Sequence, residues 1–123
     1  MKANISKKEE ELIDRLIKAG LQKNVAKTLV YIAGQDETKS REIESEMGLR
    51  QPEVSIAMQI IRERGWVDKS DIKKEGKGRP VHAYSLKEGF EDIISEIEEE
   101  QKQKIEEIED NLKQIKDLVK DLE

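Results

Sequence analysis

The stretch GLRQPEVSIAMQIIRERGWVDKSDIKKEGKGRPVHAYSL, residues 48–86, decides the fold of this 123-residue chain. Its first three residues, 48–50, predict a turn, and a helix is expected from about Gln51 to a stop at Gly65. Pro52 fits the first turn of that helix, where its missing N–H costs no hydrogen bond. The turn therefore presents the N-terminus of a short helix.

Two strands are expected after this helix, over residues 66–72 and 81–86, because apolar and polar residues alternate there. Between them lies a basic tip, residues 73–79, whose two glycines allow a tight turn. A helix N-terminus beside a charged hairpin is the reading half of a winged helix-turn-helix.

Three further helices are predicted upstream. Ser6 and Glu9 have the spacing of a capping box and open the first helix, which Gly20 ends. The second runs over residues 24–33, and a loop follows it. Ser40 is expected to cap a third helix that continues to Met47.

Residues 87–123 have the pattern of one long helix. Apolar residues recur at steps of three and four, with one discontinuity around Gln101, which is the spacing of a coiled coil. A single apolar stripe needs a second helix, most simply from another copy of the chain. The expected dimerisation residues are Ile94, Ile97, Ile105, Ile108, Leu112, Ile115, Val119 and Leu122.

The predicted fold class is therefore α+β and mostly α: a winged helix-turn-helix domain over residues 1–86 and a dimerising coiled-coil helix over residues 87–123. The orientation of the two coil helices, parallel, antiparallel or folded back on the domain, is left open by the sequence.

The charge of the chain differs between these two parts. The net charge is −5. Residues 1–86 hold 17 basic and 14 acidic residues, whereas residues 87–123 hold 6 and 14. The second part should avoid DNA, and the first can contact it through a local basic patch.

Composition excludes several classes of site. The chain has no cysteine and a single histidine, His82, so disulfides, thiolate metal sites and a Ser-His-Asp triad are not expected. No catalytic residues, metal or cofactor are predicted, and no enzymatic activity is expected. No apolar run reaches the roughly 20 residues of a membrane span, and the N-terminus lacks a signal-peptide core, so a cytoplasmic protein is expected.

The helix that follows the turn carries the side chains expected to read DNA bases. Glutamine pairs with adenine and arginine with guanine in the major groove. Glu53 either accepts from a cytosine or is a helix N-terminal charge stabilised by the dipole. The predicted recognition residues are Arg50, Gln51, Glu53, Ser55 and Gln59; the alternative is a solvated helix face.

The basic tip is expected to contact phosphates or the minor groove, through Lys73, Lys74, Lys77 and Arg79. Its alternative is an ordinary solvated turn. His82 is expected to be exposed on the second strand, and Tyr84 to pack against the sheet, although either could approach a phosphate.

These segments resemble the winged-helix regulators of the MarR, ArsR and TrmB type, archaeal members included. GLRQPEVSIAMQIIRERGWV is similar to their turn and reading helix, GKGRPVHAYSL to their wing, and GLQKNVAKTLVYIAG to their second helix. The resemblance covers about residues 10–86, and it implies that residues 50–59 enter the major groove and residues 73–79 form the wing.

The resemblance has two departures. Ile56 and Ile60 stand where relatives often carry basic or polar groups; they could pack on another helix or a partner subunit, or Ile56 could meet a thymine methyl. The Cys and His ligands of metal-sensing relatives are absent.

The predicted function is sequence-specific binding of double-stranded DNA by a homodimeric transcriptional regulator, with repression as the default direction. Two rivals remain: a winged-helix module that binds a protein, and a sensor gated by a small-molecule effector.

Overall fold

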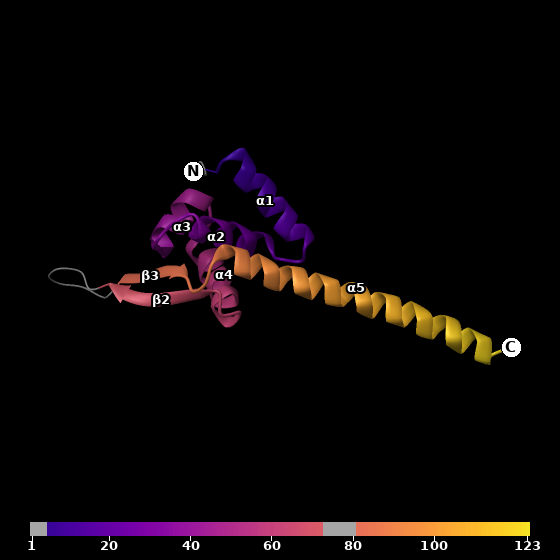
Figure 1. The fold of residues 1–123 in the computed structure, drawn as a ribbon. Helices are drawn as coiled ribbons and strands as arrows, with labels where there is room; N and C mark the ends of the chain where they lie inside the picture. Colours follow the sequence, from indigo (N-terminus) through magenta and orange to yellow (C-terminus); the bar gives the residue numbers. More distant parts are fainter. Residues whose placement is uncertain (1–4, 73–80) are drawn as a thin grey trace. The chain divides into compact units, whose positions relative to one another are not determined.

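The computed structural model describes residues 5–72 and 81–123. By its internal contacts the chain divides into two compact units, Met1–Phe90 and Glu91–Glu123. Among the described residues, the first unit holds four helices and a small sheet, and the second is formed by the long helix α5 (Phe90–Asp121). Figure 1 shows these elements in chain order.

The first unit contains the elements α1 (Lys7–Lys18), α2 (Lys23–Ala33), β1 (Thr38–Lys39), α3 (Ser40–Met47), α4 (Gln51–Glu63), β2 (Val67–Ile72) and β3 (Val81–Leu86). Helix α2 contacts α1, α3, α4 and β3. It is apolar over most of its circumference, with Val25, Ala26, Leu29, Val30 and Ile32 buried, which is expected of a helix enclosed by its neighbours. The core is therefore built around α2.

Three helices end in the same way. At the ends of α1, α3 and α4, Gly20, Gly48 and Gly65 adopt positive φ angles of 107°, 66° and 75°. The residue after each glycine donates its backbone N–H back into the helix, from Leu21 to Leu16, from Leu49 to Glu44 and from Trp66 to Ile61. These are the hydrogen bonds of a glycine-terminated helix end, and they turn the next apolar side chain inward. Leu21, Leu49 and Trp66 are all buried.

Of the two helix starts for which a cap was predicted, one agrees with the structure and one does not. The capping box at the start of α1 is confirmed, since Ser6 and Glu9 exchange side-chain-to-backbone hydrogen bonds of 3.0 and 3.2 Å. The prediction that Ser40 caps α3 is wrong. Ser40 is already the first helical residue, and the backbone N–H of Lys39 donates instead to the Glu42 carboxylate at 3.0 Å.

The sheet has the strand order β1-β3-β2 with both pairings antiparallel. Strand β1 was expected to be loop, because two residues carry no periodicity; it forms where Thr38 and Lys39 pair with Tyr84 and Ala83 of β3. In the β2–β3 pairing, Lys69 lies opposite Tyr84 and Asp71 opposite His82. Partners directly opposite one another share a face, so Lys69, Asp71, His82 and Tyr84 belong to one face of the sheet.

In the second unit, burial changes along α5. Ile93, which the sequence analysis did not single out, is fully buried, and Ile97 is 4% exposed. Ile94 is half-buried. The other six predicted dimerisation residues, from Ile105 onward, are 47% to 87% exposed, so the unpartnered apolar stripe begins at Ile105.

Candidate nucleic-acid interface

The turn between α3 and α4 positions the N-terminus of α4. Gly48 supplies the left-handed conformation, Leu49 is buried, and Arg50 returns to extended backbone with φ −86° and ψ 157°. The Arg50 side chain is 85% exposed. The buried Leu49 side chain therefore fixes the middle of this three-residue turn, while the N-terminus of α4 stays open to solvent.

Glu53 caps that N-terminus. Its carboxylate accepts a hydrogen bond from the Arg50 backbone N–H at 2.8 Å and lies 3.5 Å from the Arg50 Nε. The hydrogen bond from the Arg50 backbone lowers the pKa of Glu53, and contacts with the side chains of Arg50 and Asn24 lower it further. The carboxylate is therefore engaged at the helix end, which favours the helix-charge alternative for Glu53 over cytosine recognition.

One exposed stripe of α4 is polar. Gln51, Ser55, Gln59 and Arg62 are exposed and follow one another at steps of four, four and three, so they share a helix face. The buried residues Val54, Ala57, Met58 and Ile61 occupy the other side. Three of the predicted recognition residues thus lie in line, and Arg62, which the sequence analysis did not include, continues the line.

The polar stripe borders the sheet. An open hollow is lined by residues of α4, by Lys69 of β2, and by His82 and Tyr84 of β3; from α4 it includes Gln51, Ser55, Gln59 and Arg62. Lys69 and His82 are exposed and Tyr84 is 7% exposed, which agrees with the expectations for His82 and Tyr84. The hollow brings α4 and residues of β2 and β3 to one surface.

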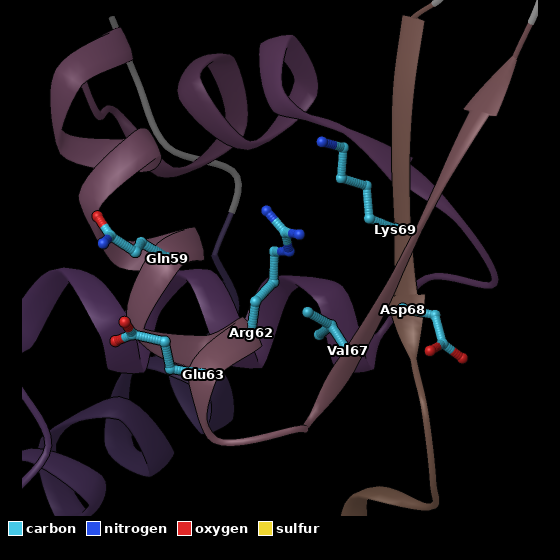
Figure 2. Close-up of a pocket in the computed structure, with 6 residues that line it drawn as sticks. All are labelled: Gln59, Arg62, Glu63, Val67, Asp68 and Lys69. Carbon is cyan, nitrogen blue, oxygen red and sulfur yellow. The ribbon is translucent and has the colours of Figure 1, made fainter.

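A second hollow lies beside the first and shares Gln59, Arg62 and Lys69 with it. In Figure 2 the Arg62 guanidinium and the Lys69 ammonium extend into the space between α4 and β2. Glu63 and Asp68 also line this hollow, and their carboxylates extend to opposite sides of the view, apart from the two cations (Figure 2). Among the described residues, neither cation has an ion-pair partner, so the two charges are available to an anion.

Farther along the hairpin, His82 Nδ1 lies 2.7 Å from Asp71 Oδ1. Both side chains are about half exposed, at 49% and 58%. The contact engages the carboxylate of β2 that shares a sheet face with Lys69. It was not foreseen, because residues eleven apart in the chain meet only through the strand register.

The remaining predicted residues lie outside the described part of the chain or away from the polar stripe. The wing residues Lys73, Lys74, Lys77 and Arg79 lie outside the described residues. Ile56 is 59% exposed and Ile60 is half-buried. Within residues 5–72 and 81–123 no group of three or more His, Asp or Glu side chains could hold a metal ion. No helix in that part of the chain combines the length and apolar character that crossing a bilayer requires.

Comparison with known proteins places the fold. Neither a family model nor a curated protein matches the sequence. Among solved structures, a possible transcriptional regulator from Methanosarcina mazei Go1 is similar, with a TM-score of 0.67, 15% identity, and 83% of this chain and 87% of that chain covered. The archaeal chromatin protein TrmBL2 is similar over 93% of this chain but only 41% of its own, with a TM-score of 0.70 and 13% identity.

A MarR family transcription regulator, SP03579, is similar with a TM-score of 0.55 and 13% identity, over 84% of this chain and 66% of that one. At such identities the similarity concerns the fold. The winged helix-turn-helix fold predicted from residues 48–86, of the kind found in MarR-type and TrmB-like regulators, is confirmed.

Proposed function

We propose that this chain is a transcriptional regulator that binds double-stranded DNA sequence-specifically as a homodimer. The observation that carries the proposal is the stripe of Gln51, Ser55, Gln59 and Arg62 on the exposed side of α4, with Lys69 beside it. Amide and guanidinium groups on a helix that follows a three-residue turn suit the edges of bases in the major groove.

The cations have a separate role in this proposal. Arg62 and Lys69 extend into one space, while the carboxylates of Glu63 and Asp68, which also line the hollow, extend to its sides (Figure 2); such a pair of cations suits a backbone phosphate. Lys73, Lys74, Lys77 and Arg79 of the hairpin tip would continue the phosphate contacts. Arg50, at the open end of the turn, would reach a base or a phosphate. Glu53 would hold the helix end and leave reading to its neighbours.

Each protomer would read one half-site of a pseudo-palindromic operator, with residues 1–86 on the DNA and residues 87–123 joining the two copies. The net charge of −8 on residues 87–123 keeps that segment away from phosphates. Repression, by occupying a promoter, is the direction proposed.

The experiment is selection of bound duplexes from a random pool, followed by fluorescence anisotropy at several salt concentrations. A two-fold-symmetric motif and a steep fall of affinity with salt are expected. Lys69→Glu should weaken binding to all sequences and reduce the salt slope by about one, because one phosphate contact is lost. Gln59→Ala should instead change the selected sequence.

Lys8→Glu is the matched control for Lys69→Glu. Lys8 is an exposed lysine on α1, and α1 lines neither hollow. Its reversal makes the same change of net charge and should leave affinity nearly unchanged. The double reversal of Lys77 and Arg79 tests the hairpin tip in the same assay. Equal losses from Lys8→Glu and Lys69→Glu would contradict a defined interface.

A second function is favoured by one observation. Ile56, on the exposed side of α4, is 59% exposed, and an apolar group there suits a protein partner as well as a thymine methyl. A winged-helix domain that binds a protein would show no DNA binding even at low salt. In that case Ile56→Ser would abolish capture of the partner, and Lys69→Glu would not.

A further inference from the structure

The apolar stripe of α5 is three heptads long. Its six members are exposed and follow one another at steps of three and four: Ile105, Ile108, Leu112, Ile115, Val119 and Leu122. In heptad terms Ile105, Leu112 and Val119 occupy the a positions, and Ile108, Ile115 and Leu122 occupy the d positions. The stripe has the period of a two-helix seam.

A parallel pairing of two such helices is disfavoured by the residues of the central heptad. Two-stranded parallel coils favour β-branched residues at a and leucine at d, whereas leucine at a with isoleucine at d shifts the preference to higher oligomers. Here the central heptad has Leu112 at a and Ile115 at d. A parallel dimer would place two isoleucines against each other at both Ile108 and Ile115.

An antiparallel pairing uses every member of the stripe once. With a two-fold axis between residues 113 and 114, Leu112 faces the partner's Ile115, Ile105 faces the partner's Leu122, and Ile108 faces the partner's Val119. A shift of one heptad in either direction would leave apolar residues of the stripe without a counterpart. The pattern therefore selects one register.

The charges beside the stripe agree with this register. In it Glu109 lies opposite the partner's Lys116, and Lys102 lies opposite the partner's Glu123, each pair occurring twice. Lys102 also has a neighbour in its own helix, Glu98, at 3.3 Å. In a parallel dimer the corresponding positions give one kind of attractive pair, Lys104 with the partner's Glu109, which also occurs twice.

We propose that a second copy of this chain covers the stripe of α5 in antiparallel orientation, with the two-fold axis between Lys113 and Gln114. The inference rests on the homodimer of the proposed function and does not depend on DNA binding. The interface would consist of the apolar residues of both helices, flanked by ion pairs between Glu109 of one copy and Lys116 of the other.

Cross-linking in the absence of DNA tests the orientation, because the chain has no cysteine of its own. Ile105→Cys and Leu122→Cys are made as separate single variants. Facing core positions have the Cα separation that a disulfide needs, about 5.5–6 Å. Residues 105 and 122 of one helix are about 25 Å apart, which excludes an internal bridge.

The expected result is a disulfide-linked dimer in the mixture of the two variants and little of it in either variant alone. Efficient cross-linking of each variant by itself would show a parallel pairing and overturn the proposal. A monomer in sedimentation equilibrium of the unmodified chain would overturn the proposed dimer as well. DNA affinity, measured separately, reports on the DNA-binding function alone.

A charge exchange gives a second measurement. Lys116→Glu places a second carboxylate opposite the partner's Glu109, so the dimer dissociation constant should rise about three- to tenfold. Adding Glu109→Lys should restore the affinity. In a parallel dimer Lys116 faces the partner's Asn111, so Lys116→Glu would have little effect and Glu109→Lys would bring no recovery. That result would reject the antiparallel register.

Discussion

Two buried threonines differ in what their hydroxyl groups contact. Thr28 of α2 is fully buried, and its Oγ1 has no hydrogen-bond partner within the described residues. Thr38 of β1 is 1% exposed, and its hydroxyl has two possible partners, the Lys39 carbonyl oxygen at 3.5 Å and the side chain of Tyr31. Burial raises the pKa of Tyr31, and the contact with Thr38 opposes that rise. The same substitution at the two positions therefore compares a buried hydroxyl that has a partner with one that has none in the described part of the chain.

Thr28→Val should therefore raise the free energy of unfolding by about 1 kcal/mol, because a buried hydroxyl without a partner costs its desolvation. Thr38→Val should lower it by about 1 kcal/mol, because Tyr31 then loses its partner. Urea denaturation followed by circular dichroism measures both. A loss at both positions would mean that the Thr28 hydroxyl is satisfied in solution.

Glu53 makes stability depend on pH. Its folded-state pKa is lowered by the Arg50 backbone N–H below the ordinary value of 4.5. The stabilisation is therefore complete above the unfolded-state value and is lost as the pH falls through the lower folded-state value. Glu53→Gln should be less stable than the parent near neutral pH, and the difference should vanish in acid. Unfolding midpoints from pH 7 downward check this; a constant difference would contradict it.

At the scale of single elements, the helix ends depend on glycine to different degrees. Gly65 has φ +75°, and a Cβ added there would meet no atom of the described residues within 4 Å. Gly34 has an ordinary negative φ, and a Cβ added there would lie 3.7 Å from its nearest neighbour, the Tyr31 carbonyl oxygen. Gly65→Ala should destabilise by about 1 kcal/mol through left-handed backbone strain alone. Gly34→Ala should be neutral or slightly stabilising. Similar thermal midpoints for the two variants would refute the role given to Gly65.

The ends of elements could be predicted where a local signal marks them. Gly20, Gly48 and Gly65 stop helices by their own conformation, so the sequence placed these stops correctly. The predicted cap at Ser40 was wrong because the Glu42 carboxylate accepts the hydrogen bond from the Lys39 backbone N–H, and Lys39 is the residue before the helix. Strand β1 has no local signal, since it exists only through pairing with β3.

The residues of the candidate site also divide into those that local sequence could predict and those that depend on strand pairing. Gln51, Ser55 and Gln59 were predicted as outward-facing residues of the helix that follows the turn, and all three line one hollow. Arg62 is one further step along the same stripe and could have been found. Lys69 and the His82–Asp71 contact could not, because they depend on the strand register and on how the hairpin packs beside α4.

At the scale of the whole molecule, the proposed dimer and the proposed DNA interface use different residues and can be tested separately. Ile108→Asp places a carboxylate in the apolar stripe of α5 and should give a monomer in sedimentation. DNA binding should then fall roughly 100-fold, because the two half-sites are no longer bound together. The control is Glu106→Asp, which introduces the same residue beside the stripe. A monomeric parent chain would contradict the coiled-coil prediction.

In the proposed dimer, the length of α5 also sets the distance between the points from which the two copies of the first unit extend. From Phe90, its first residue, to the proposed two-fold axis is about 35 Å along the helix. The two tether points of an antiparallel dimer are then about 70 Å apart, which is two turns of B-form DNA. Such a dimer suits half-sites spaced by roughly 20 base pairs, or the joining of two duplexes into a loop. The random duplexes of the proposed selection must therefore be longer than about 20 base pairs, because shorter ones would contain only one half-site.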